Sequence, residues 1–228
     1  MFDGKLGFIV ALPAEAASIN RHRSRPNGRG CAVASGGIGA SAVRAAVESV
    51  VREGATSLIS WGTAGGLESD LVSGTLLVYQ TAINATDELE YRCDPDLNLW
   101  LKNRLEPLAP LSTRGLSSAT PIIDTAAKTR LHQRYNCAAV DMESAAIGAV
   151  ALAAGIPFSA VRVVVDPAHF SLPSSALAGL GSNEGQRIRT VSALIQHPSE
   201  CGAMIRLALW YFRAIKRLSH AARLLTTP

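Results

Sequence analysis

Short apolar runs alternate with helical patterns along most of the chain, and this alternation predicts an α/β protein. The runs have the length of buried strands, and the segments between them repeat apolar residues every three or four positions, as helices do. Predicted strands cover Leu6–Val10, Cys31–Ser35, Ser57–Trp61, Thr75–Thr81, Gly115–Ala119, Ala138–Val140 and Phe158–Val165. A first predicted helix begins near residue 14, and further helices are predicted at 41–53, about 142–154 and about 203–225.

The strand runs are apolar throughout, which is typical of a mainly parallel sheet that is covered by helices on both faces. We therefore expect a single three-layer α/β/α domain over residues 1–228, with a central mixed, largely parallel sheet. The stretch 170–185 is rich in Ser, Gly and Pro and is expected to form a long loop. Loops of that length are often functional.

The composition excludes several classes of protein. Hydrophobic residues make up 48% of the 228 residues and charged residues only 18%, whereas a soluble domain has about 25% charged residues. This balance excludes an intrinsically disordered chain and suggests a large apolar interior, an oligomer face, or both. The net charge is +4, but the surplus lies at residues 21–29 and in the C-terminal segment. A nucleic-acid groove across the fold is therefore not expected.

Membrane spans, secretion and metal binding also find no support in the sequence. No run reaches the ~18 apolar residues of a membrane span, and Leu6–Leu12 is too short for the apolar core of a signal peptide. The four cysteines stand alone, which predicts reduced and mostly buried thiols in a cytoplasmic protein. The five histidines are scattered, so no metal site is expected.

Three acidic residues stand just after predicted strands, where α/β proteins bind their ligands. They are Glu15, Glu143 and Asp166. Glu15 or Glu143 alone could equally be a solvated carboxylate or a helix N-terminal charge. Arg162 is more unusual, because it interrupts an apolar strand. Such a charge should be paired within the core or bind an anion.

Two glycine-rich turns are predicted to follow strands. Gly37–Ala42 matches the G-x-G-x-x-A pattern of dinucleotide-binding proteins. However, the next strand ends in Ser60-Trp61-Gly62 instead of the acidic residue that would hold the ribose. The second turn, Gly62–Leu67, offers backbone N–H groups and a hydroxyl for an anion, a water or a sugar. A nucleotide-binding module without turnover therefore stays as a non-enzymatic alternative.

Five blocks between about residues 4 and 170 carry a resemblance to a known family. They are Gly7–Glu15, Ser35–Gly39, Gly62–Gly66, Val140–Glu143 and Val161–Asp166. In this order they resemble the purine nucleoside phosphorylase and nucleosidase family, including the methylthioadenosine/S-adenosylhomocysteine nucleosidases. The resemblance implies the fold of that family and assembly into a homo-oligomer. It also implies cleavage of the N-glycosidic bond of a purine nucleoside without a cofactor.

The segment after the last block resembles one branch of that family, the hopanoid-associated phosphorylases. The matching residues are Asp166–His169, Leu172-Pro173 and Ala176–Leu180. Members of this branch are thought to remove adenine from adenosylhopane. The resemblance thus implies adenine release from a 5′-substituted adenosine, with adenosylhopane in hopanoid biosynthesis as the best candidate.

The resemblance also implies catalytic roles. Glu15 matches the residue that activates a water for attack on the anomeric carbon, and Arg162 and Thr63 match residues that help to place this water. Asp166 would protonate or hydrogen-bond the purine at N7 and at the exocyclic amine. A carboxylic acid in this role works best with a raised pKa, which a partly buried strand end provides.

Other residues would bind the substrate. Glu143 would hydrogen-bond the ribose hydroxyls while Met142 packs on the sugar. Gly65 belongs to the turn that would cradle the substrate, and backbone groups near Thr120 to Ile122 are candidates for reading the base.

Two differences from the family's phosphorylases bear on the nucleophile. Phosphorylases of this family usually carry a basic residue in the first loop and an arginine just before the second glycine turn, where this chain has Glu15 and Ser60. Water is therefore favoured as the nucleophile, and phosphate stays possible as a co-substrate. A neighbouring subunit could lend one of the arginines at 21–29. The alternatives within this chemistry are a methylthioadenosine/S-adenosylhomocysteine nucleosidase and a phosphate-dependent purine nucleoside phosphorylase.

The predicted C-terminal helix is amphipathic and basic. Its apolar positions are Ile205, Leu209, Phe212, Ile215 and Leu218, and its basic positions include Arg206, Arg213, Arg217 and His220. The simpler interpretation is a helix that packs on the core with its basic face in solvent. The other is an interfacial helix that brings the enzyme to a lipid-linked substrate, which would make the protein peripheral to the inner membrane face.

Overall fold

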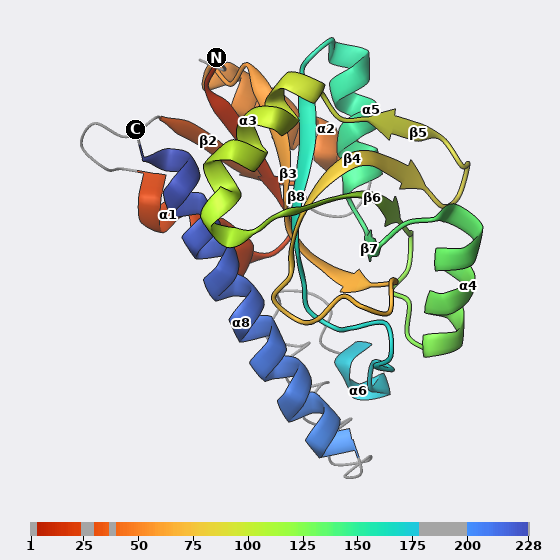
Figure 1. Ribbon diagram of the computed structural model, residues 1–228. Helices are drawn as coiled ribbons and strands as arrows, with labels where there is room; N and C mark the ends of the chain where they lie inside the picture. Colours follow the sequence, from red (N-terminus) through yellow and green to blue (C-terminus); the bar gives the residue numbers. More distant parts are fainter. Residues whose placement is uncertain (1–3, 24–29, 37–39, 178–199, 228) are drawn as a thin grey trace.

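The structure, a computed structural model, describes residues 4–23, 30–36, 40–177 and 200–227. One eight-stranded sheet forms its centre (Figure 1). Its strands are β1 (Leu6–Val10), β2 (Cys31–Ser35), β3 (Ser57–Gly66), β4 (Leu76–Asn84), β5 (Glu90–Arg92), β6 (Leu111–Ser117), β7 (Ala139–Asp141) and β8 (Phe158–Val164). The helices are α1 (Pro13–Arg23), α2 (Ala40–Arg52), α3 (Pro95–Leu105), the 3₁₀-helix η1 (Glu106–Leu108), α4 (Thr125–Tyr135), α5 (Ser144–Ala154), α6 (Ser174–Leu177) and α8 (Cys201–Thr226).

The sheet is mixed and branches at its centre. The strand order is β2-β1-β3-β7-β6-β4-β5, and β8 pairs with both β3 and β4. Strand β3 runs parallel to β8 as far as Ala64 and then pairs antiparallel with β7 at Gly65 and Gly66. The ends of β7 and β8 therefore lie on either side of the last residues of β3. This branch point brings the side chains that follow these strands to one place.

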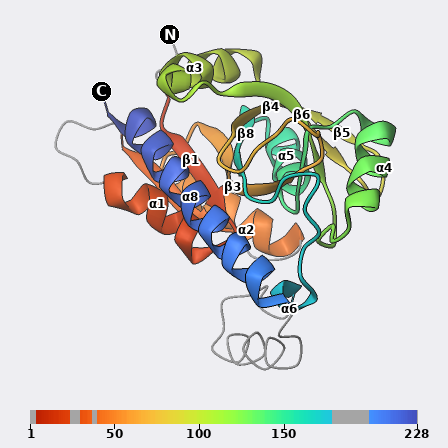
Figure 2. The ribbon, with the colours of Figure 1, turned by 60° about the horizontal axis from the view of Figure 1, so that its bottom comes forward.

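Helices cover both faces of the sheet, which gives three layers. On one face α2 and α5 pack on the sheet through small and branched side chains such as Val47 and Ile147. On the other face α1, α3 and α8 pack through Ile19, Leu101 and Leu218. Helices α1 and α8 run side by side (Figure 2). The expected α/β/α architecture with a mixed sheet is confirmed.

The structure also corrects several predicted elements. The segment Gly62–Gly66 is not a turn after a strand, because β3 continues through it. Helix α6 lies within the expected loop 170–185, of which residues 178–185 lie outside the described residues. The sequence interpretation missed β5, α3, η1 and α4. The residues Gly37–Gly39 of the G-x-G-x-x-A pattern also lie outside the described residues, and α2 begins directly after them.

Candidate active site

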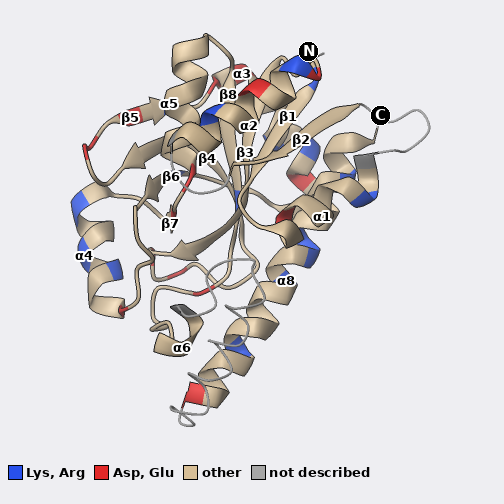
Figure 3. Ribbon diagram, turned by 180° about the vertical axis from the view of Figure 1, so that it is seen from behind, with Lys and Arg blue, Asp and Glu red and all other residues tan. Residues whose placement is uncertain are grey.

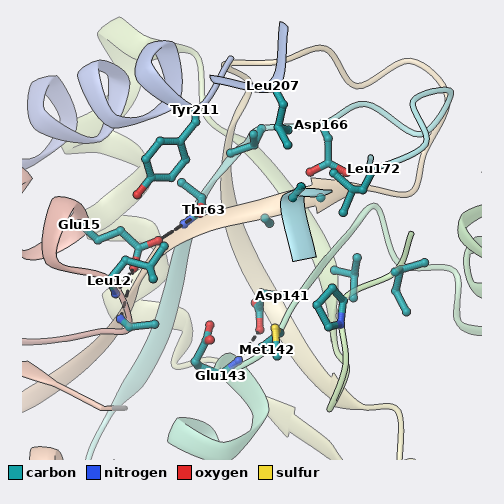
Figure 4. Close-up of a pocket in the computed structure, with 18 of the residues that line it drawn as sticks. Leu12, Glu15, Thr63, Asp141, Met142, Glu143, Asp166, Leu172, Leu207 and Tyr211 are labelled. Atoms are coloured by element: carbon teal, nitrogen blue, oxygen red, sulfur yellow. Dashed lines mark hydrogen bonds between the residues drawn. The ribbon is translucent and has the colours of Figure 1, made fainter. Parts of the chain in front are cut away.

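A pocket of about 490 Å³ opens at the branch point of the sheet (Figure 4). This volume lies within the ~300–1,000 Å³ that is typical of small-molecule sites. Polar side chains from the ends of β3, β7 and β8 and from the start of α1 line one part of it, and apolar side chains of α8 and its neighbours line another. The described lining residues include Ala11, Leu12, Glu15, Thr63, Gly65, Thr120, Ile122, Asp141, Met142, Glu143, Asp166, Leu172, Ala176, Met204, Leu207 and Tyr211.

Glu15 is held rigidly at one side of the pocket. It lies in the first turn of α1 and is 2% exposed. Its Oε2 accepts the N–H groups of Ala11 and Leu12, at 3.2 and 3.1 Å. Its Oε1 accepts the N–H and the hydroxyl of Thr63, at 2.8 and 3.1 Å. The anion that the N–H of Thr63 cradles is thus a carboxylate of the protein itself.

The glycines of β3 allow charged side chains to approach the strand closely. A Cβ atom at Gly62 would lie 2.5 Å from Oε1 of Glu15 and 2.6 Å from Nη1 of Arg162. A Cβ atom at Gly65 would lie 3.2 Å from Oδ2 of Asp166. The glycine-rich segment therefore makes room for three site residues, which is a different role from the predicted turn.

Arg162 is buried beneath the pocket and is paired. Its Nε donates to Oδ2 of Asp141 at 3.0 Å, and its Nη2 donates to the hydroxyls of Ser60 and Ser144 at 2.7 and 3.0 Å. Asp141 also accepts from the hydroxyls of Ser117 and Ser144. Although burial alone would raise the pKa of Asp141, the charge of Arg162 and these hydrogen bonds lower it. Of the two expectations for Arg162, an ion pair is the one observed.

Glu143 stands just before α5 and faces the pocket. Its side chain is 24% exposed, and its Oε2 lies 3.6 Å from Nη2 of Arg162. Burial raises the pKa of Glu143 to about 7, and the nearby carboxylates of Asp141 and Glu15 act in the same direction, while Arg162 opposes them. This carboxyl group can therefore gain or lose a proton near neutral pH. Met142, beside it, is 40% exposed and also lines the pocket.

Asp166 follows β8 and reaches the pocket from the side opposite Glu143 (Figure 4). Its Oδ2 accepts from the ammonium group of Lys128 at 2.5 Å. Burial raises the pKa of Asp166, and the Lys128 charge opposes this rise. A buried carboxyl group with a raised pKa is suited to donate a proton.

The remaining wall is apolar. Leu172 comes from the segment after β8, and Leu207 and Tyr211 come from α8. The hydroxyl of Tyr211 points toward Glu15 and Thr63 (Figure 4). Burial raises the pKa of Tyr211 to about 12, and the charge of Glu15 adds to this effect. The phenol therefore stays neutral and can donate a hydrogen bond at physiological pH.

The pocket brings together the site residues that the sequence singles out, with one exception. Glu15, Thr63, Gly65, Thr120, Ile122, Met142, Glu143 and Asp166 all line it. Arg162 lies beneath them and contacts Glu143. The sequence interpretation gave no role to Asp141, Lys128 or Tyr211. Asp141 stands directly after a predicted strand, so a signal for it was present, whereas Lys128 belongs to a helix that the sequence interpretation missed.

Two further findings concern classes of site and surface. Within the described part of the chain, no group of three or more His, Cys, Asp and Glu side chains could hold a metal ion. No helix among these residues is long and apolar enough to cross a membrane. Cys31, Cys93 and Cys137 are buried, and Cys201 is partly exposed.

Comparison with solved structures agrees with the fold. The structure is similar to futalosine hydrolase of Helicobacter pylori, with a TM-score of 0.72 and 15% identity over 97% of both chains. It is also similar to S-adenosylhomocysteine nucleosidase from Streptococcus pyogenes, with a TM-score of 0.72 and 18% identity over 99% of this chain and 97% of that one. A search of curated proteins by sequence similarity found no match to the chain.

The family is shown by the sequence itself. Residues 8–195 match the model of the phosphorylase superfamily, a range that contains every lining residue except those of α8. The match confirms the predicted kind of enzyme, one of the nucleoside phosphorylase and nucleosidase type. The chain belongs to the phosphorylase superfamily.

Proposed function

We propose that this enzyme hydrolyses the N-glycosidic bond of a 5′-substituted adenosine and releases adenine. The observation that carries the proposal is the placement of three carboxyl groups around one pocket. Glu15 and Asp166 lie at two sides of it, and Glu143 lies with Met142 at a third (Figure 4). A nucleoside needs one group for the nucleophile, one for the base and one for the sugar between them.

The reaction divides among these groups as follows. Asp166 donates a proton to N7 of the purine, so that the C1′–N9 electron pair leaves with a neutral base. The sugar passes through an oxocarbenium-like state, and the carboxylates beside it stabilise the developing positive charge. Glu15 accepts a proton from the water whose oxygen bonds to C1′ and then releases it to solvent. Glu143 accepts hydrogen bonds from the ribose hydroxyls, and solvent restores the proton of Asp166.

The charge of the pocket supports water as the nucleophile. None of the described lining residues is a lysine or an arginine. Arg162 lies below the pocket with Asp141 as its partner, and the hydroxyl of Ser60 accepts a hydrogen bond from Arg162. A phosphate dianion would therefore enter beside Glu15 and Glu143 with little opposite charge to offset its desolvation. Of the arginines that a neighbouring subunit could lend, Arg25 and Arg29 lie outside the described residues.

The apolar wall supports a substrate with an apolar 5′ substituent. Leu172, Met204 and Leu207 line the pocket. Leu172 and Leu207 lie on the side of Asp166, across from Glu143 (Figure 4), and burying a hydrocarbon group there is favourable. Adenosylhopane is the best candidate, because the resemblance of the Asp166–Leu180 segment points to the hopanoid-associated branch. Methylthioadenosine and S-adenosylhomocysteine are the alternatives. A solved relative from Helicobacter pylori contains 5′-methylthioadenosine in its active site.

Adenine release tests this proposal. The purified enzyme is incubated with adenosine, methylthioadenosine, S-adenosylhomocysteine and adenosylhopane, each with and without phosphate. The expected result is release that does not depend on phosphate and is fastest with an apolar 5′ substituent. Strict dependence on phosphate would make the enzyme a phosphorylase, and the absence of release from all four substrates would contradict the proposal.

We further propose that the outer face of α8 contacts an anionic membrane surface. Its inner face lines the pocket, whereas Ile205, Leu209 and Phe212 on the outer face are 63, 64 and 59% exposed. Basic residues also lie along this helix (Figure 3). A cleft of about 580 Å³ lies beside its C-terminal half and is lined by Arg213, Lys216, Arg217 and His220, together with the apolar Val72 and Leu111. Apolar and basic residues in this arrangement suit an interfacial helix.

Flotation with liposomes tests the membrane contact. The enzyme is expected to float with vesicles that contain phosphatidylserine at low salt and to dissociate as the salt concentration rises. The triple variant I205S/L209S/F212S should float less while keeping its activity on methylthioadenosine. A wild-type enzyme that remains in the soluble fraction at low salt would contradict the proposal.

The predicted homo-oligomer also remains a proposal. Large apolar side chains are exposed away from the pocket, among them Leu99 and Leu152, at 58 and 73%. Exposed apolar residues of this size suit a contact between subunits. Light scattering on the eluate of a sizing column should give at least twice the monomer mass, and a monomeric mass would contradict the proposal.

A further inference from the structure

The ion pair behind Asp166 is the unusual feature of this site. Lys128 lies on α4, and its side chain is fully buried. Its ammonium group donates to Oδ2 of Asp166, to the carbonyl of Pro167 at 3.0 Å and to the carbonyl of Phe170 at 2.9 Å. A lysine ammonium has three protons to donate, and three acceptors surround this one. Each proton of the ammonium group therefore has an acceptor inside the protein. Lys128 is not among the residues that line the pocket.

These contacts fix the position of the Asp166 carboxyl group. Lys128 binds Oδ2 only, and Oδ1 is not part of the ion pair. The two carbonyls belong to the segment that directly follows Asp166, so one ammonium group ties both the side chain and its backbone to α4. The backbone is also anchored on the other side, where the carbonyl of Asp166 accepts the N–H of Gly66 at 2.8 Å.

We propose that Lys128 is a positioning residue for the departure of the base: it orients Asp166 and stabilises the carboxylate that remains after Asp166 has given its proton to N7. The inference rests on the proposed function. The proton moves from Asp166 to the base as the C1′–N9 bond breaks, and a new negative charge is left on a buried carboxyl group. Lys128 is already in contact with that charge, so no reorganisation is needed as it develops.

The same contact determines the pH range in which Asp166 holds its proton. Burial raises the pKa of this carboxyl group, and Lys128 limits the rise. Activity that needs the protonated acid is lost as the pH rises through this pKa. Replacing Lys128 with methionine removes the opposing charge, so the pKa rises further and the alkaline limb of the rate profile moves up. An opposite charge at this range changes a pKa by about 1 to 3 units.

The test is the pH profile of kcat/KM for adenine release, measured on the best substrate of the four named above. The variants are K128M and K128R, with D166N as reference. K128M is expected to move the alkaline limb up by about 1 to 3 pH units and to lower the maximal rate, because the acid becomes weaker. K128R keeps the charge and should keep the limb near its wild-type position.

A second substrate separates positioning from simple loss of structure. In 4-nitrophenyl β-D-ribofuranoside the leaving group departs without a proton, so K128M should lose much less rate on it than on the nucleoside. If thermal melting shows that K128M does not fold, K128Q, which keeps amide donors but drops the charge, is measured in its place. An unmoved alkaline limb, or equal losses on both substrates, would overturn the inference. A wild-type enzyme that releases no adenine would instead overturn the proposed function on which it rests.

Discussion

Asp141 ends β7 and Asp166 follows β8, the two strands that flank the end of β3, and each forms a buried ion pair with a basic side chain. Asp141 pairs with Arg162 at 3.0 Å, and Asp166 pairs with Lys128 at 2.5 Å. Burial raises the pKa of both, but the outcome differs. The pKa of Asp141 is lowered overall, whereas that of Asp166 is raised.

The hydrogen bonds around the two carboxylates explain this difference. Asp141 accepts from two serine hydroxyls and from the N–H groups of Glu143 and Ser144, in addition to Arg162. For Asp166, the side-chain donor is Lys128. Each donor stabilises the charged form of a carboxyl group. Asp141 is therefore a permanently ionised part of the scaffold, and Asp166 is a group that can carry a proton.

The largest expected effect comes from removing the proton carrier. Asp166→Asn should lower kcat for adenine release by about 100- to 10,000-fold, the usual contribution of a general acid. The exposed Asp70 supplies the matched control, D70N, which should be close to wild type. Steady-state kinetics on the same substrate measure both. A wild-type kcat for D166N would place the leaving-group chemistry elsewhere.

The Asp141–Arg162 pair should contribute more to the stability of the fold than the Asp166–Lys128 pair. Arg162→Met leaves the Asp141 charge buried without its partner, which should lower the free energy of unfolding by about 3 to 5 kcal/mol. K128M should cost less, because Asp166 can take up a proton and become neutral. Denaturant unfolding of both variants at neutral pH checks the order. Equal losses would remove the distinction between the two pairs.

Glu15 resembles Asp141 in accepting several hydrogen bonds, and both residues line the pocket. Glu15→Gln keeps the shape of the side chain and removes the base, so kcat should fall by about 100-fold or more. KM should change little, because a general base acts mainly in the transition state. A separate measurement of kcat and KM decides the point. A change in KM alone would make Glu15 a binding residue.

The smallest effect is expected at Glu143, whose pKa burial raises to about 7, above the usual range of a glutamate. Protonation turns one oxygen into a donor and weakens the hydrogen bonds accepted from the ribose hydroxyls, so kcat/KM should fall as the pH drops below about 7. Glu143→Gln should lower kcat/KM by about tenfold at high pH and flatten this acid limb. If the limb persists in E143Q, another group is responsible for it.

Much of the framework could be predicted from local patterns in the sequence. The bounds of β1 and β2 agree with the expected strands, because continuous apolar runs between glycines and prolines leave few alternatives. Helix α8, Cys201–Thr226, was expected at about 203–225. The acidic residues after the strands were found for the same reason, since charged side chains at the ends of apolar runs mark the rim of a sheet.

The features that the sequence did not predict depend on contacts between residues that are distant in the sequence. Lys128 lies on a helix with mostly polar residues, and its burial comes from the segment that begins 38 residues later. The path of β3 through Gly62–Gly66 depends on pairing with β7 and β8. Glycine in a strand allows close approach, but the sequence does not show which side chains approach.

The most direct test of the account is to identify the sugar that forms when the enzyme cleaves its substrate in excess phosphate. Phosphorus-31 NMR separates sugar 1-phosphate from inorganic phosphate, and mass spectrometry detects the free sugar. The account predicts free sugar in an amount equal to the adenine released, with no sugar 1-phosphate, and it predicts that E15Q loses this product. Sugar 1-phosphate as the product would contradict it, because the nucleophile would then be an anion that Glu15 repels.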